Sequence, residues 1–289
     1  GETIVLSEDI SISKPIILSK NVTIDGGNKT ITPAADFVAD GNLAVIVFAN
    51  GATAYSVERN YTVKNLTIEG FSGLTRVLRA NFCDSLVENC SFVNNSVSEG
   101  VVTSSYGKTN VKDCTFDGNT SAFSIVNIGF DVSSGTELAV TVDGSEFVGN
   151  KAAIALIYAA SSVAVTDNYF NGNIHSGDNA NAAAVLAGPY TGTVSYTVDI
   201  KENAFVNAFG QEGGNALPDV YAEDWSENYN ATTSFDLSSN YWNGGEPNYA
   251  VSGKPSIDLS DYYTTYADGV KGDLTEVKVA VAKIGEVEY

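Results

Sequence analysis

The chain of 289 residues is poor in basic side chains and contains a single His. It has 15 Lys and Arg against 35 Asp and Glu, which gives a formal net charge of −20. A surface without a basic stripe cannot displace the counterions of a phosphate backbone, so we expect no binding to nucleic acid or anionic lipid. The acidity favours solubility and can gather divalent cations.

Cysteine is also scarce, and long apolar runs are missing. The three cysteines are an odd number and form no CxxC pair, which excludes a disulfide scaffold and a cysteine zinc site. No apolar run approaches the length of a membrane span, so we expect no membrane insertion. A hydrophobic content of 44% is nevertheless enough for a continuous core.

What the chain has instead is an internal repeat. Its six-residue template reads apolar, any, turn residue, small or polar, any, and Phe-like. The template occurs seven times: VKNLTI 63–68, VENCSF 87–92, VKDCTF 111–116, VDGSEF 142–147, VTDNYF 165–170, IKENAF 200–205 and LSSNYW 237–242. Steps of 24, 24, 31, 23, 35 and 37 residues separate the copies. We interpret this as one repeat domain with inserted loops.

The repeat predicts short strands rather than helices. Its segments are rich in Val, Thr, Phe and Tyr and are interrupted by Gly and Asn every few residues. At the third position stand Asn65, Asn89, Asp113 and Gly144, residue types that tolerate a left-handed turn. Gly and Asn residues that follow the Phe-like position predict a second corner there. Coils of such strands stack about 4.8 Å apart. The sequence therefore predicts an all-β, single-stranded parallel β-solenoid of about 8–10 coils.

Stacking predicts that equivalent residues lie over one another in columns. The sixth position gives a column of aromatic rings: Ile68, Phe92, Phe116, Phe147, Phe170, Phe205 and Trp242. The fourth position gives an apolar column that continues as a run of amides: Leu66, Cys90, Cys114, Ser145, Asn168, Asn203 and Asn240. Cys90 and Cys114 become neighbours, and we expect a reduced, buried pair rather than a disulfide.

The domain organisation follows from where the repeat holds. We expect residues 1–272 to be the β-solenoid with end caps, and residues 273–289 to be a C-terminal strand or linker toward a following domain. The long steps predict inserted loops at residues 120–139, 174–197 and 206–236. Loops on a rigid scaffold are the usual place of binding residues.

Over about residues 2–265 the pattern resembles the pectin-lyase-like right-handed parallel β-helix family. The likeness is carried by VTIDGGNKTI at 22–31, by the V-x-[ND]-C-x-F-x-[GN]-N units and by the amide column. NYWNGGEP at 240–247 resembles the closing NYWG-x-x-P motif of β-helix domains in large bacterial and archaeal surface proteins. The resemblance implies a right-handed β-helix block of an exported, extracellular or cell-surface, adhesin-like bacterial protein.

Many β-helices of this kind cleave acidic polysaccharides, so catalytic sets were sought. The motifs NTD, GHG and RIK, which occur in this order in pectinase-type members of the family, are all absent. A lyase would need a basic residue, but Arg76 and Arg79 fall in one predicted strand at odd spacing, on opposite faces. His175 falls in the predicted loop GNIHSGDN, where we expect a surface side chain. We therefore identify no catalytic residues; the sequence favours a non-catalytic chain and leaves enzyme activity open.

The most suggestive cluster lies in the longest predicted loop and combines aromatic with acidic side chains. An aromatic face beside carboxylates can stack on a sugar ring and accept hydrogen bonds from its hydroxyls. A solvated acidic loop that packs its aromatic residues on the scaffold is the alternative. The glycan-binding candidates are Asp219, Tyr221, Glu223, Asp224 and Trp225, next to Glu227. Asp219, Glu223 and Asp224 are also weak candidates for Ca²⁺ ligands.

These observations favour a non-catalytic structural or adhesive module that contacts a polysaccharide or a host or cell-surface glycan, as a monomer. A polysaccharide lyase or glycoside hydrolase is the alternative function. The two functions predict different lateral faces. An enzyme requires a groove in which three or more Asp, Glu, Lys or Arg side chains from adjacent coils converge, whereas an adhesive module requires scattered Thr, Ser and Asn.

Overall fold

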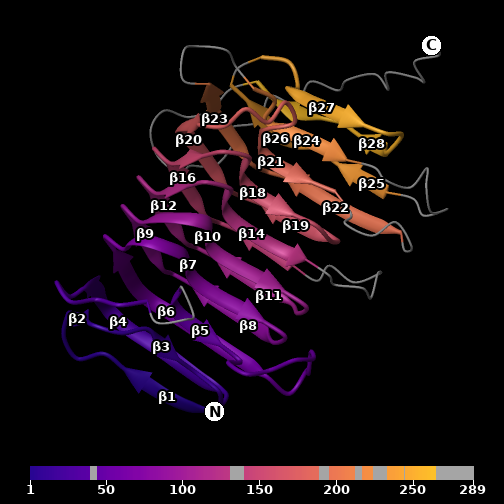
Figure 1. The fold of residues 1–289 in the computed structure, drawn as a ribbon. Helices are drawn as coiled ribbons and strands as arrows, with labels where there is room; N and C mark the ends of the chain where they lie inside the picture. The colour runs from indigo at the N-terminus through magenta and orange to yellow at the C-terminus, as the bar shows by residue number, and fades with distance from the viewer. Residues whose placement is uncertain are drawn as a thin grey trace.

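The computed structural model describes residues 1–39, 44–130, 140–188, 195–211, 217–223, 233–243 and 245–264. These residues wind into a parallel β-helix, in which each strand pairs in parallel with the equivalent strand of the next coil (Figure 1). The described part of the chain has strands but no helix, and thus none long and apolar enough to span a membrane. The predicted all-β parallel architecture is confirmed.

Three stacks of strands form the walls of the β-helix. The first stack runs through ten strands, which confirms the predicted number of coils. Its members are β1 (Glu2–Val5), β4 (Val22–Pro33), β6 (Asn60–Glu69), β8 (Asp84–Glu88), β11 (Thr109–Lys112), β15 (Val140–Asp143), β19 (Val163–Thr166), β22 (Tyr196–Lys201), β25 (Thr233–Asp236) and β28 (Ser256–Asp258).

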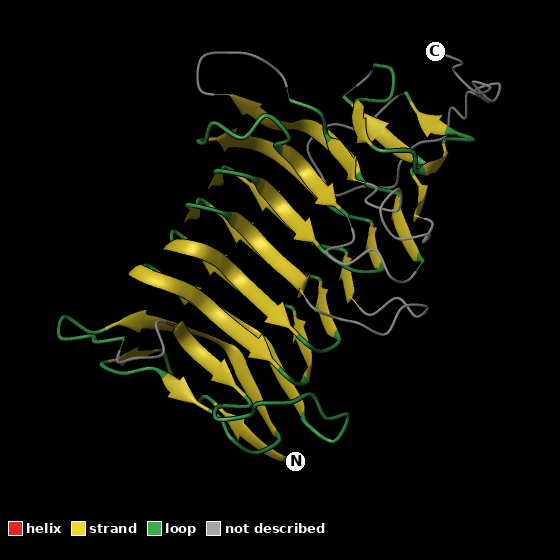
Figure 2. Cartoon of the chain, turned by 45° about the vertical axis from the view of Figure 1, so that its right-hand side comes forward, coloured by secondary structure: helices red, strands yellow, loops and turns green. Residues whose placement is uncertain are grey.

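The second stack follows the first in each of the ten described coils, and the third stack follows in the first nine. The second comprises β2 (Ile10–Ile12), the later parts of β4 and β6, β9 (Ser91–Val93), β12 (Thr115–Asp117), β16 (Glu146–Val148), β20 (Tyr169–His175), β23 (Ala204–Gln211), β26 (Asn240–Trp242) and β29 (Tyr262–Tyr263). The third comprises β3 (Ile16–Ile17), β5 (Ala44–Phe48), β7 (Ser72–Asn81), β10 (Ser96–Ser105), β14 (Ser124–Phe130), β18 (Ala155–Ala159), β21 (Ala183–Ala187), β24 (Val220–Glu223) and β27 (Tyr249–Ser252). Two short strands, β13 (Thr120–Ser121) and β17 (Lys151–Ala152), bridge the beginning of β10 to the end of β20. Figure 2 shows the strands of successive coils side by side, with loops at the corners.

The corners form where the sequence supplies residues that tolerate a left-handed backbone. At the third position of the repeat, φ is 52° at Asn65, 50° at Asn89, 51° at Asp113 and 59° at Gly144. A second set of positive φ angles follows the aromatic position, for example 53° at Asn94. The two bends on either side of each second-stack strand were both predicted, and both are confirmed.

The aromatic column is the axis of the core. Ring centroids lie 5.1 Å apart for Phe92 and Phe116 and 4.7 Å apart for Phe116 and Phe147, and the stacking continues to Trp242, 5.1 Å from Phe205. These rings are at most 2% exposed. One hydrophobic core therefore runs through the described coils.

The predicted amide column is also present. Asn168 Nδ2 donates to Asn203 Oδ1 at 3.0 Å, and Asn203 Nδ2 donates to Asn240 Oδ1 at 3.0 Å. The same oxygens accept backbone N–H groups, as from Asn168 N to Asn203 Oδ1 at 3.0 Å. Each buried amide thus satisfies backbone groups at its corner as well as the amide of the next coil.

A second ladder of buried amides lies three residues after the aromatic column, where the sequence predicted only a turn. Its amide-to-amide bonds measure 3.1 Å from Asn95 to Asn119, 3.1 Å from Asn119 to Asn150 and 3.0 Å from Asn150 to Asn173. Each Nδ2 also donates to the carbonyl of an apolar residue, such as Asn119 to Phe92 O at 2.8 Å. The second stack therefore has an amide ladder at each of its two corners, the later one in the earlier coils and the other in the later coils.

The three cysteines are buried and free, as predicted. Cys90 Sγ lies 3.6 Å from Val63 O, and Cys114 Sγ lies 3.4 Å from Val87 O. The contact with Cys114, together with burial, raises the pKa of Cys90, and burial raises that of Cys83 to about 12. Cys83 and Cys90 therefore remain protonated, and all three buried side chains pack as small core residues.

Two expectations about loops were wrong. The described parts of residues 120–139, 174–197 and 206–236 contain β13, β14, β21, β23 and β24, so the long steps hold third-stack strands as well as loops. His175 is the last residue of β20 and is 2% exposed, with Nε2 2.9 Å from Ala153 O and its ring against Phe209. The sequence placed it in a surface loop because Gly and Asn surround it. The predicted linker 273–289 lies outside the described residues.

Candidate functional site

The structure separates the candidate glycan-binding residues. Val220 and Ala222 of β24 point into the core at 0% exposure, so Tyr221 and Glu223 between and after them face outward. Tyr221 pairs in register with Leu186 and Ala250. Asp219, just before β24, is instead 6% exposed and lines a cavity that includes neither Tyr221 nor Glu223. Asp224 and Trp225 lie outside the described residues, as does Glu227.

The Ca²⁺ candidates are likewise not seen as one set. Within the described ranges, no three His, Cys, Asp or Glu side chains gather as they would around a metal ion. Asp219 and Glu223 differ in orientation, as their burial shows, and Asp224 lies outside those ranges. The prediction of a Ca²⁺ site at these residues stays a prediction.

The cavity beside Asp219 has a volume of about 520 Å³ and lies at the corner between the second and third stacks, in the last coils. Its deep wall is made of buried side chains, Phe209 at 3% and Trp242 at 2% exposure. Its rim carries four exposed amide side chains, two from β23 and two from the segment between β26 and β27: Asn207, Gln211, Asn243 and Asn248. The sequence analysis did not identify this cavity.

Asp219 is the charged group of that cavity. Burial raises its pKa to about 7, although a hydrogen bond from the Asn248 side chain acts in the opposite direction. Its backbone N–H donates to Asn248 O at 2.9 Å, and the Asn248 amide donates to Leu217 O at 2.9 Å. Asn248 therefore holds both the strand start and the carboxyl group in place.

A second hollow, of about 420 Å³, lies on the outer face of the first stack. Three ionisable residues from adjacent coils line it, Glu88 of β8, Lys112 of β11 and Asp143 of β15, and Lys112 lies between the two acids in register. Three uncharged hydrogen-bonding side chains and one apolar side chain complete the lining: Asn110, Thr141, Thr166 and Leu86. This face combines the charged groove that an enzyme requires with the polar side chains of an adhesive surface.

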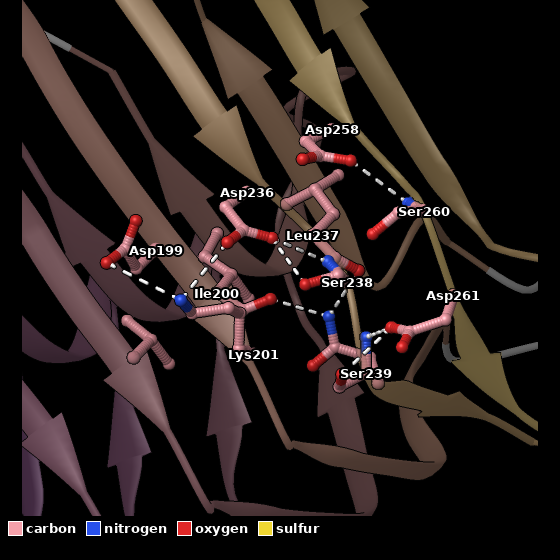
Figure 3. A network of polar contacts seen from close by, with 12 residues as sticks. Asp199, Ile200, Lys201, Asp236, Leu237, Ser238, Ser239, Asp258, Ser260 and Asp261 are labelled. Carbon is pink, nitrogen blue, oxygen red and sulfur yellow. Dashed lines mark hydrogen bonds and ion pairs between the residues drawn. The ribbon is translucent and has the colours of Figure 1, made fainter. Parts of the chain in front are cut away.

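Farther along the same face, toward the C-terminal end, aspartates stack in register. Asp199 pairs with Asp236, and Asp236 pairs with Asp258 (Figure 3). Lys201 bridges two of them, with Nζ 3.1 Å from Asp236 Oδ2 and 3.9 Å from Asp199 Oδ2. The hydrogen bond to Asp236 raises the pKa of Lys201, so the ammonium remains charged.

Asp236 and the nearby Asp261 also accept hydrogen bonds within tight turns. Asp236 Oδ1 accepts the Ser238 N–H at 3.0 Å and its hydroxyl at 2.6 Å (Figure 3). Asp261 Oδ1 accepts the Ser239 N–H and hydroxyl, both at 2.8 Å. These aspartates fix the turns that follow β25 and precede β29, which is a structural role.

The two arginines considered for lyase chemistry do not lie on opposite faces as predicted. Val77 and Leu78 are consecutive and both belong to the core, so the strand does not alternate between Arg76 and Arg79. Burial lowers the pKa of Arg76, and the Arg79 charge acts in the same direction. Arg76 forms an ion pair with Glu99 of the next coil, in agreement with the expectation of salt-bridged arginines.

Comparison with known proteins gave no relative for this chain: no family model, no curated protein and no solved structure matches it. We therefore infer the function from the contacts, burial and charges of the chain itself.

Proposed function

We propose that the chain is a non-catalytic structural or adhesive β-helix module of a bacterial cell-surface protein, and that it contacts glycans. The observation that carries the proposal is the in-register alternation of charge along the first stack. Oppositely charged side chains follow one another from coil to coil, from β4 to β15: Asp25, Lys64, Glu88, Lys112 and Asp143.

Such alternation serves a scaffold. Opposite charges on neighbouring strands stabilise the register, whereas like charges in the same places destabilise it. Lys64 Nζ lies 3.4 Å from Asp25 Oδ2, and the Asn65 amide and the Gly27 N–H, together with Lys64, lower the pKa of Asp25. Basic groups that could act as a catalytic base are in this way held by acidic neighbours, which supports a stiff lateral face rather than a reactive one.

The resemblance to pectin-lyase-like and adhesin-like β-helix blocks belongs to this proposal and supplies its extracellular location. It rests on the repeat and on NYWNGGEP at 240–247, where Asn240 ends the amide ladder and Trp242 ends the aromatic column. A motif that closes both columns is what the last coils of a β-helix block require, because ladder and column need no further partner beyond it.

A screen of the purified chain against neutral and acidic polysaccharides tests this function. We expect binding of at least one glycan, measured by calorimetry, without release of new reducing ends or unsaturated sugars. Turnover of any polymer at a rate proportional to protein concentration would contradict the non-catalytic role.

A polysaccharide-active enzyme remains the second candidate, because Glu88, Lys112 and Asp143 share one hollow. The register sets Glu88 and Asp143 two coils apart, roughly 9–10 Å along the helix axis. Inverting glycoside hydrolases use carboxylates about 6.5–9.5 Å apart. If turnover is found, Glu88→Gln and Asp143→Asn should each abolish it, and Glu146→Gln, on the second stack, should not.

A further inference from the structure

The repeat breaks its own rule at the cavity beside Asp219. Three residues after the aromatic position stand Asn95, Asn119, Asn150 and Asn173, the second amide ladder. After Phe205 and Trp242 the same position holds Ala208 and Gly245. Two successive coils thus lack the amide that the four preceding coils place there.

The missing amides leave space. The Asn173 amide, with no ladder partner in the next coil, donates instead to the backbone carbonyl of Ala208 at 3.0 Å. A Cβ atom added at Gly172 or Gly210 would meet no described atom within 4 Å. The cavity of about 520 Å³ opens beside these residues. A local departure from an otherwise consistent pattern is where a functional site is expected, because such departures cost stability.

The lining of the cavity indicates its ligand. Side-chain amides offer two donors and an acceptor each, which suits the adjacent hydroxyls of a sugar, and four of them surround the opening. Asp219 is a buried part of a lining that also includes the apolar side chains of Ile174 and Leu217, and Ile174 is 41% exposed. Among the described residues that line the cavity, Asp219 is the one charged side chain.

We propose that this cavity binds one neutral sugar residue of a glycan, with its hydroxyls on the amide rim and on Asp219 and its C–H face against Ile174. The inference rests on the proposed glycan contact and names its place and its sugar class. Above about pH 7, where Asp219 is ionised, a uronate or another acidic sugar is disfavoured, because its carboxylate would be brought toward Asp219 without a cation among the described lining residues. The raised pKa of Asp219 is consistent with a water-poor wall that strengthens hydrogen bonds to the ligand.

The test compares neutral oligosaccharides of glucose, galactose and mannose with oligomers of galacturonate and glucuronate, titrated into the native chain and three variants. Ala208→Asn restores the repeat and fills the cavity, and we expect it to weaken neutral-sugar binding at least roughly a hundredfold. At pH 8, where Asp219 is ionised, Asp219→Asn should weaken it roughly tenfold, because a hydrogen bond to a charged group is replaced by a neutral one. Glu146→Gln, on the outer surface of the second stack, is the matched control and should bind as the native chain does.

Circular dichroism and thermal unfolding establish that each variant is folded, and Asn243→Ala, which only shortens an exposed rim side chain, replaces Ala208→Asn if that variant does not fold. Loss of binding in the cavity variants alone supports the inference. Native-like binding by folded cavity variants overturns it while the proposed glycan contact stands. Tighter binding of the acidic oligomers overturns the sugar class. If the native chain binds none of these sugars, both the inference and the proposed glycan contact fail.

Discussion

The β-helix has a corner on each side of the second stack, and both corners are closed by buried Asn side chains, but in different coils. At the corner before the aromatic column, the amides are Asn168, Asn203 and Asn240, and Cys and Ser occupy the position in the preceding coils. At the corner after it, the amides come first, from Asn95 to Asn173. Only the coil of Asn168 and Asn173 carries an amide in both described ladders.

The difference between the corners lies in what replaces the amide. Cys114 Sγ approaches Val87 O at 3.4 Å, as Asn168 Nδ2 approaches Val142 O at 2.9 Å, so a thiol fills the same space and contacts the equivalent carbonyl. Ala208 and Gly245 do neither, and there a cavity opens. The size of the substituted side chain therefore decides whether a coil is closed or hollow at that corner.

The largest effect is expected where a ladder is cut in its middle. Asn119→Ala removes the acceptor of the Asn95 N–H and amide, and the donor to Phe92 O and to Asn150 Oδ1. Because several buried polar groups lose their partners, the free energy of unfolding should fall by about 4–5 kcal/mol. Urea unfolding measures this.

Asn89→Gly is the matched control for that change, because Gly keeps the left-handed backbone of this corner, where φ is 50°. Asn89 donates to Asn65 Oδ1 at 2.8 Å on the exposed side of the corner, so its loss should cost about 1 kcal/mol or less. Equal losses in the two variants would show that burial of the inner ladder contributes nothing, and the comparison of corners would fail.

A somewhat smaller effect, and one that depends on pH, is expected at the hollow corner. The pKa of Asp219 rises from 3.8 to about 7, so the folded chain retains a proton that the unfolded chain has lost. The free energy of unfolding should therefore fall as pH rises from about 4 to about 7, by about 3–4 kcal/mol from this group, and level off above that. Urea unfolding between pH 4.5 and 8 measures this.

Asp219→Asn should remove that part of the pH dependence. The native chain carries a net charge of −20, and the variant differs by one charge, so general repulsion is nearly the same in both. Parallel pH profiles of the native chain and the variant would mean that Asp219 is ionised freely in the fold, and that the wall of the cavity is wet.

Filling the hollow corner should have a moderate effect of opposite sign. In Ala208→Asn the new side chain can accept from the Asn173 amide, which now donates to Ala208 O. Cavity filling and an extended ladder should raise the free energy of unfolding by about 1–2 kcal/mol. Ala208→Leu fills space without an amide, and therefore tests whether the gain in stability comes from the added volume or from the extended ladder. A loss of stability in both variants would indicate that the cavity holds water the fold requires.

The sequence predicted the fold because stacking repeats the same residues. Asn89 and Asp113 have the left-handed φ that their residue types suggested, and Phe92 lies over Ile68 and under Phe116, as the template requires. The third stack was harder to predict. Some of its strands, such as β21 with AAVLA, are buried along their whole length and do not alternate, so small residues suggested a loop.

The candidate site could be predicted less well. The acidic loop drew attention because aromatic and acidic residues are adjacent in sequence, yet only Asp219 of its described members reaches a cavity. The other lining residues come from segments 35 or more positions apart, such as Asn173 and Ala208, and their proximity depends on coil stacking. The signal that could have identified them is the break in the repeat at Ala208 and Gly245, which becomes visible only when the position after the aromatic column is followed down the chain.

The smallest effect is expected when Cys114, at the corner before the aromatic column, is replaced by Asn, the residue that occupies the same position in the later coils. In Cys114→Asn the amide can donate to Val87 O, which the thiol contacts now, and can accept the Cys90 N–H as Asn168 accepts that of Ser145 at 2.9 Å. Gains and losses nearly cancel, so unfolding should change by less than about 1 kcal/mol, whereas Cys114→Leu, which has no polar group, should lose about 2 kcal/mol. If Cys114→Asn lowers the stability more than Cys114→Leu does, the coils around Cys114 do not have room for an amide. The change from Cys to Asn along the column would then reflect a difference in coil dimensions rather than two equivalent ways to close one corner.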